Sequence, residues 1–257
     1  MPTQAESDVF LVLKRSFQRG IPTGRKIASK AVAEAIAGHE HDAAWIKQNF
    51  SILVEQVQLD AYEKYLEFEK QVGAAALAEA FLPQLGEEAT AIDAIRIIGA
   101  NFYGLDKFFL GLTQGRRVRA GKAFELLIHE VFVLLQYPFT SQAVINGQPD
   151  FILPSVEHYY RNPMDAIIFT VKRTLRERWR QIVTEGTRGL GFFLATIDEG
   201  IAQRDLNDML ASRIYLVVPS RIKTECYQNA TNVISFEHFF QFFLDPAMER
   251  WRAAGVI

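Results

Sequence analysis

The chain has little cysteine, little net charge and no long apolar run, and each of these scarcities excludes a class of protein or site. Cys226 is the only cysteine among 257 residues, so an intrachain disulfide and a cysteine-rich zinc site are both excluded. No stretch approaches the roughly 18 apolar residues of a membrane span, and the N-terminus lacks the pattern of a secretion signal. We therefore expect a soluble protein of a reducing cytoplasm.

The formal net charge of -2 excludes a uniformly basic surface, so binding to nucleic acid would require local clusters of cations. Two clusters occur. Residues 172–188 contain six basic and two acidic side chains, a local charge of +4. The other cluster consists of Arg116, Arg117, Arg119 and Lys122. Because a solvated helix face has the same charge pattern, the clusters do not decide the function by themselves.

The pattern of apolar residues divides the chain into two regions. Residues 1–112 are rich in helix-forming residues with apolar side chains at spacings of three and four, which predicts an all-helical N-terminal region. Residues 113–257 alternate between helix and strand patterns, which predicts an α/β domain with a mixed β-sheet flanked by helices. The expected strands are 151–153, 166–171 and 214–218, and the expected helices are 120–135, 175–187 and 206–211.

Asp150 and Lys172 are the first candidates for catalysis. Asp150 follows Pro149 at the start of one expected strand, and Lys172 ends the next expected strand. Hydrolysis of a phosphodiester bond requires a metal, carboxylates that hold it, and a cation near the developing charge. These two residues supply a carboxylate and a cation at a spacing typical of Mg²⁺-dependent nucleases.

A second carboxylate is required nearby, and many such nucleases carry it two residues before the lysine. Here that position is Thr170, which cannot replace the charge of an acid. Glu185 can supply the missing carboxylate if residues 175–187 form a helix that packs against the strand.

The segment between Lys172 and Glu185 has the chemistry for reading G·C pairs. Arginine can form two hydrogen bonds to guanine O6 and N7, and glutamate can accept one from cytosine N4. Arg176, Glu177 and Arg178 offer these groups in succession. On charge alone a solvated helix is the simpler explanation, but the proximity to Asp150 and Lys172 favours base recognition.

Taken together, these motifs resemble the PD-(D/E)xK type II restriction endonucleases of the EcoRII, SsoII and PspGI group, which is related to the NgoMIV branch. The resemblance depends on the order of Asp150, Thr170-Val-Lys172, the hexapeptide Arg-Glu-Arg-Trp-Arg-Gln of residues 176–181, and Glu185. It extends over about 100 residues, from Arg116 to Pro219, and it includes Glu125. Residues 1–112 contribute no shared motif.

The resemblance implies a restriction-endonuclease-like fold and Mg²⁺-dependent cleavage of double-stranded DNA at a palindromic site with a CC…GG core, of the CCNGG or CCWGG type. It implies that Asp150 and Glu185 ligate Mg²⁺, that Lys172 contacts the scissile phosphate or the attacking water, and that Glu125 is an outer acid. Arg176, Glu177 and Arg178 would read the C·G pairs. The expected contacts to the DNA backbone are Arg116, Arg117, Arg119, Lys122, Arg173 and Arg180.

A homodimer or a higher oligomer in the cytoplasm of a prokaryotic cell is expected, because a two-fold protein reads a two-fold site most simply. Residues 1–112 would supply dimerisation and further DNA contacts. Three alternatives stay open: an enzyme for a CCGG core, a non-catalytic DNA-binding protein, and a helical protein with a merely solvated charged face. The phenylalanines between 236 and 243 are expected to pack against the core or a partner subunit.

Overall fold

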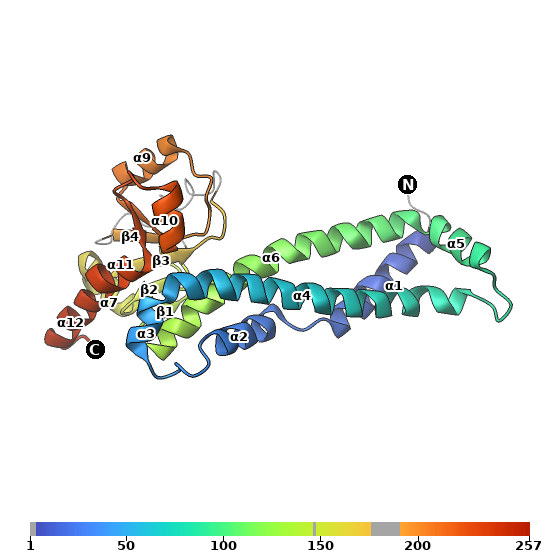
Figure 1. Ribbon diagram of the computed structural model, residues 1–257, viewed down its shortest axis with the longest axis horizontal. Helices are drawn as coiled ribbons and strands as arrows, with labels where there is room; N and C mark the ends of the chain where they lie inside the picture. The colour runs from blue at the N-terminus through green and yellow to red at the C-terminus, as the bar shows by residue number, and fades with distance from the viewer. Residues whose placement is uncertain (1–3, 146–147, 176–190) are drawn as a thin grey trace. The chain divides into compact units, whose positions relative to one another are not determined.

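The computed structural model describes residues 4–145, 148–175 and 191–257 (Figure 1). The chain forms two compact units, and each of them is discontinuous in sequence. The helical unit comprises residues 1–27 and 59–122, and the sheet unit comprises residues 28–58 and 123–257. The predicted limit at residue 112 lies inside one long helix, and the functional division at that residue stays a prediction.

The N-terminal half is helical throughout its described part, as its composition predicts. The elements are α1 (Gln4–Gly20), α2 (Gly24–Ala35), α3 (Ala43–Gln48), α4 (Phe50–Phe81), η1 (Leu82–Gln84), α5 (Ala91–Ala100) and α6 (Phe102–Leu134). The helix predicted from residue 120 is therefore the last part of α6. None of the helices in the described part of the chain has the length and hydropathy of a membrane span.

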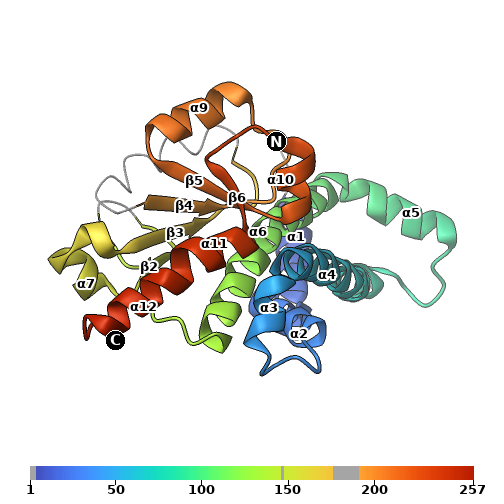
Figure 2. The ribbon, with the colours of Figure 1, turned by 60° about the vertical axis from the view of Figure 1, so that its left-hand side comes forward.

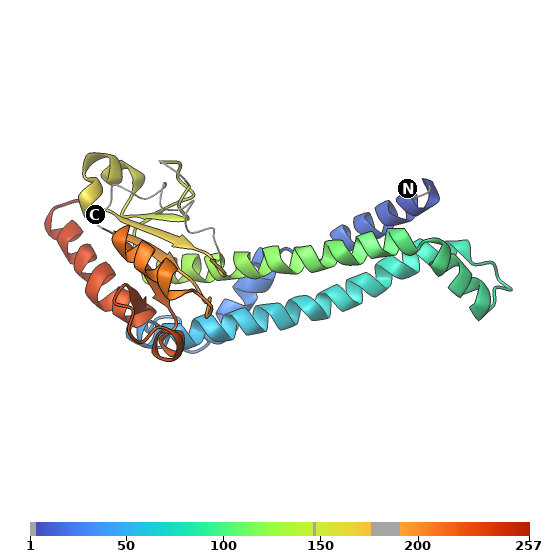
Figure 3. The same cartoon turned by 90° about the horizontal axis from the view of Figure 1, so that it is seen from above.

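Within the helical unit, the C-terminal part of α4 and the N-terminal part of α6 lie side by side (Figure 3). Arg116 contacts Glu69 and Arg119 contacts Tyr65, so the two helices run antiparallel. Helix α1 joins them through an edge-to-face contact between Phe17 and Phe108. The buried side chains of this unit's core are Leu13, Phe17, Ala76, Ala80, Phe81, Leu105, Phe108 and Leu112.

The sheet unit contains a six-stranded mixed sheet in the order β1-β2-β3-β4-β5-β6 (Figure 2). The strands are β1 (Thr140–Ser141), β2 (Phe151–Leu153), β3 (Ile167–Val171), β4 (Gly191–Ala195), β5 (Ile214–Val218) and β6 (Val233–Ser235). β1, β2 and β3 pair antiparallel, and β3 to β6 pair parallel. The predicted fold class is confirmed, although β1, β4 and β6 were not among the expected strands.

Helices cover both faces of this sheet, which explains why all five residues of β3 are buried. One face packs against α7 (Val156–Arg161), α9 (Gln203–Ala211) and α10 (Ser220–Cys226) through a cluster of buried hydrophobic residues. On the other face Phe169 contacts Phe132 of α6 and Phe239 of α11 (Phe236–Phe239). The remaining elements are η2 (Pro163–Asp165), the π-helix η4 (Phe240–Leu244) and α12 (Asp245–Ala253).

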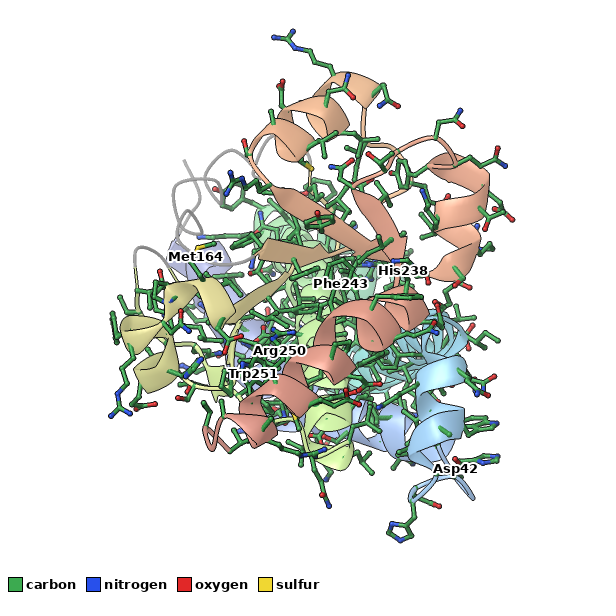
Figure 4. All side chains as sticks on the ribbon, turned by 90° about the vertical axis from the view of Figure 1, so that its left-hand side faces the viewer. Asp42, Met164, His238, Phe243, Arg250 and Trp251 are labelled. Carbon is green, nitrogen blue, oxygen red and sulfur yellow. The ribbon has the colours of Figure 1, made fainter. Side chains whose placement is uncertain are left out.

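The C-terminal aromatic residues pack into the core, as the sequence predicts. Phe236, Phe239 and Phe240 are buried, and Phe243 contacts Phe193 of β4. Figure 4 labels Phe243 together with Arg250 and Trp251 of α12, whose side chains bond to Asp165. This C-terminal segment therefore stabilises the sheet, although Phe242 stays exposed.

Candidate active site

Asp150 and Thr170 face each other across the β2–β3 ladder. Ile152 pairs with Ile168, so continuing the antiparallel register by two residues places Asp150 opposite Thr170. Side chains of such a pair lie on the same face and meet. The Thr170 hydroxyl donates a hydrogen bond of 2.8 Å to Asp150 Oδ2. The sequence placed these residues in one site but did not indicate this contact.

Lys172 lies beside the same carboxylate. Its Nζ is 3.3 Å from Asp150 Oδ2, and the backbone N–H of Val171 donates to that oxygen at 2.7 Å. The Asp150 side chain is 14% exposed and the Lys172 side chain 39% exposed. Asp150 and Lys172 therefore pair at the ends of β2 and β3, and the lysine is the more exposed of the two side chains.

Gln142 joins Asp150 to Glu125. Its backbone N–H donates to the carbonyl oxygen of Asp150 at 3.0 Å, and its side-chain amide donates to Glu125 Oε1 at 3.3 Å. Gln142 has a φ of 54°, a conformation that a non-glycine residue adopts only where its surroundings fix it. Glu125 is thus linked to Asp150 by hydrogen bonds through a single residue, Gln142. No pattern in the sequence singles out Gln142.

A second set of bonds fixes the chain between Lys172 and Leu175. The Lys172 N–H donates to the Ala195 carbonyl at 2.9 Å, and the Thr196 hydroxyl donates to the Arg173 carbonyl at 3.2 Å. The N–H of the buried Leu175 donates to Asp198 Oδ2 at 2.9 Å. The end of β4 and the loop after it therefore hold the chain from Lys172 to Leu175.

Several predicted site residues lie outside the described residues. These are Arg176, Glu177, Arg178, Arg180 and Glu185, and also the side chain of Arg117. Within the described part of the chain no group of three acidic, histidine or cysteine side chains is placed to hold a metal ion. Of the predicted ligand pair of Asp150 and Glu185, only Asp150 lies among the described residues.

The basic residues predicted to contact the DNA backbone have different surroundings. In the helical unit, Arg116 forms a double hydrogen bond with Glu69, which raises the pKa of the guanidinium. Arg119 donates to the hydroxyl of Tyr65 and lies over its ring. Burial, followed by a hydrogen bond with Glu69, raises the pKa of Tyr65 to about 12. Lys122 belongs to the same unit, whereas the exposed Arg173 follows Lys172 in the sheet unit.

Comparisons with known proteins identify the family of this chain. The family model described as EcoRII C terminal matches residues 87–240. The type II restriction enzyme SsoII of Shigella sonnei is 24% identical over 215 residues, covering 79% of this chain and 70% of that enzyme. The type II restriction enzyme EcoRII of Escherichia coli is 33% identical over 148 residues, covering 54% of this chain but only 36% of that enzyme.

Solved structures agree with the fold. Metal-depleted Ecl18kI in complex with uncleaved DNA superposes with a TM-score of 0.81 at 24% identity, over 96% of this chain and 85% of that one. A complex of the restriction endonuclease PspGI with substrate DNA gives a TM-score of 0.66 at 23% identity, over 92% of this chain and 96% of that one. The chain therefore belongs to the EcoRII C-terminal family, in the group of type II restriction endonucleases that includes SsoII and EcoRII.

Proposed function

We propose that this protein is a Mg²⁺-dependent restriction endonuclease that hydrolyses double-stranded DNA at a palindromic site with a CC…GG core. The observation that carries the proposal is the contact between Asp150 and Lys172 at the ends of β2 and β3. Family membership supports the reaction class, and SsoII and EcoRII are both named as type II restriction enzymes. The contact supplies the two chemical groups that this reaction requires at one place.

The residues at the site fit a magnesium ion. Mg²⁺ prefers oxygen ligands, keeps several waters, and is usually held by one or two carboxylates together with substrate phosphate oxygens. The donors from the described residues go to Asp150 Oδ2, so we propose Oδ1 as the oxygen that ligates the ion. Glu185 is our proposed second ligand. When bound, the ion would polarise the phosphate and lower the pKa of a water molecule.

The side chains around the ion have distinct proposed roles. Lys172 places a positive charge where the scissile phosphate gains negative charge, which stabilises the transition state. Its bond to Asp150 holds the ammonium group at the site before the substrate arrives. Glu125 acts through Gln142, so we assign it to the support of the Asp150 segment.

Specificity for the CC…GG core is proposed to come from Arg176, Glu177 and Arg178, whose donors and acceptors match adjacent G·C pairs. Arg173, Arg180 and the cluster from Arg116 to Lys122 are proposed for the DNA backbone. The two hydrogen bonds from Arg116 to Glu69 argue that Arg116 contributes little to these contacts. A CCGG core and a non-catalytic DNA-binding role are the alternatives to this reading.

We further propose that the protein acts as a homodimer in the cytoplasm of a prokaryotic cell, where duplex DNA is present. A palindromic site matches two-fold protein symmetry. The helical unit supports self-association, because α5 and the start of α6 expose Ile92, Ile95, Ile98 and Phe102. Light scattering on the wild type and on Ile95→Lys tests this: the variant should be monomeric with an unchanged circular dichroism spectrum.

Digestion of a fully sequenced plasmid with Mg²⁺, with every cut end mapped, tests the function. The wild type should give discrete fragments that share one palindromic sequence. Lys172→Ala should give none while melting at a similar temperature. Fragments without a common sequence, or equal cutting by the variant, would contradict the proposal.

A further inference from the structure

Thr170 occupies the position at which many related nucleases carry an acid, and it is the only polar residue of β3. Its neighbours in the strand are Ile167, Ile168, Phe169 and Val171, all apolar and buried. Thr170 itself is 2% exposed. Valine has the same shape and would fill the same space without any need for a hydrogen-bond partner. The hydroxyl therefore calls for an explanation beyond packing.

The hydroxyl is directed at one particular oxygen. Thr170 Oγ1, the Val171 N–H and Lys172 Nζ all lie within 3.3 Å of Asp150 Oδ2, at 2.8, 2.7 and 3.3 Å. Three donors on one oxygen satisfy it fully, and Oδ1 accepts no hydrogen bond from the described residues. The carboxylate is thus held by one oxygen and presents the other.

Rotation of an aspartate carboxylate about χ2 is broad and has no sharp staggered preference. Hydrogen bonds from the surroundings must fix it. The Val171 N–H comes from the backbone, and Lys172 is a long side chain that is partly exposed and would also have to contact DNA. Thr170 is the short, buried side chain with a single function at this point, so its hydroxyl is suited to set the rotation of the carboxylate.

We propose that Thr170 is a positioning residue that fixes Asp150 through Oδ2, so that Oδ1 faces the divalent cation. The inference rests on the proposed function, because it assigns Asp150 to the metal. The position that elsewhere supplies a second metal ligand here orients the first ligand. The charge that Thr170 cannot supply must then come from another acid, for which Glu185 is our candidate.

Binding of Mn²⁺ to the full-length protein tests this inference without any cleavage step, because Mn²⁺ takes the same carboxylate and water oxygens as Mg²⁺. The free ion is followed by electron paramagnetic resonance. Thr170→Val should weaken Mn²⁺ binding about tenfold, in line with the loss of one hydrogen bond to a charged group. Thr170→Ser keeps the hydroxyl and should bind within about twofold of the wild type.

Ser16→Ala is the matched control. Ser16 is also buried, and its hydroxyl donates to the Glu79 carboxylate at 2.7 Å within the helical unit. Its loss should leave Mn²⁺ binding unchanged. If Thr170→Val fails to fold, Thr170→Cys replaces it, because the thiol is of similar size and only a weak donor.

The outcomes separate this inference from the proposed function. A wild type that cuts no plasmid at a fixed site would overturn the function itself. A wild type that cuts, together with a folded Thr170→Val that binds Mn²⁺ as tightly as the wild type, would overturn only the role of Thr170. Equal weakening by Thr170→Val and Thr170→Ser would also overturn it, because the hydroxyl would then not be the cause.

Discussion

Two acid–base pairs of this molecule, one in each unit, use their carboxylates in different ways. In the helical unit Arg116 donates to both oxygens of Glu69, whose side chain is 6% exposed. In the sheet unit the three donors from described residues to the Asp150 carboxylate converge on Oδ2 and leave Oδ1 without a described donor. A pair that satisfies both oxygens serves stability. A pair that leaves one oxygen available can bind a further ligand, which is the requirement of an active site.

We call Asp150 with Lys172 the open pair, because one carboxylate oxygen has no described donor, and Glu69 with Arg116 the closed pair. Substitution of the open pair should have the largest effect on activity and little effect on stability. Asp150→Asn keeps the shape but removes the charge that a cation needs, so we expect the rate of DNA cleavage to fall by at least about 10³. The free energy of unfolding should change by less than about 1 kcal/mol, since the amide oxygen can still accept from Thr170 and Val171. Single-turnover cleavage and urea denaturation measure the two quantities. A large loss of stability would show that this pair, like Glu69 with Arg116, mainly holds the fold.

Thr170→Asp would place a second acid beside Asp150 and would create the more common motif, which has an acid two residues before the lysine. Without a divalent ion, two carboxylates in contact cannot both ionise freely, so we expect a loss of about 2 kcal/mol in unfolding free energy. Mg²⁺ should restore part of it, because binding to the folded state alone raises stability. Thermal melts with and without Mg²⁺ measure the difference. Thr170→Asn, of equal size and no charge, should melt independently of Mg²⁺; if it responds in the same way, charge is not the cause.

The structural features that could be predicted from the sequence are those that a local pattern of residues determines. β3 and β5 are apolar runs bounded by breaking residues, and their limits agree with the prediction to within one residue. β1 has two residues, too few for any periodicity. β4 and β6 were missed although they are apolar in the same way as β3 and the three-residue β2, which were predicted.

Asp150 and Lys172 lie together because both are at strand ends that the pattern located, and their catalytic roles stay a prediction. The bond from Thr170 to Asp150 depends on the register of two strands separated by a loop, which residue types do not encode locally. For the same reason the sequence did not indicate the bridge by Gln142 or the contact of Asp198 with Leu175. The sequence also did not indicate the bond between Arg116 and Glu69, which lie 47 residues apart in the chain, and the proposed contact of Arg116 with the DNA backbone stays a prediction.

The closed pair of Glu69 and Arg116 should show the reverse behaviour, because its loss should lower stability and leave activity unchanged. Glu69→Gln leaves the guanidinium of Arg116 without its anion, which we expect to cost about 2 kcal/mol of unfolding free energy, less than for a fully buried pair because Arg116 is 37% exposed. The DNA cleavage rate of the folded variant should equal that of the wild type. Glu34→Gln, in the exposed pair with Lys30, is the control and should cost below about 0.5 kcal/mol. Equal costs for the two variants would remove the distinction between closed and exposed pairs.

The smallest effect is expected at Arg221, although it contacts more acids than either pair. Its guanidinium bonds to Glu199 at 2.7 Å, Glu225 at 2.8 Å and Glu55 at 2.9 Å, and the hydrogen bonds to Glu199 and Glu225, followed by that to Glu55, raise its pKa. All four side chains are well exposed, so water and salt screen them, and the number of contacts should not translate into stability. Glu199→Gln should therefore shift the melting temperature by no more than about 1 °C in 0.15 M salt. A fall as large as that of Glu69→Gln would mean that partner number, rather than burial, decides what an ion pair contributes in this protein.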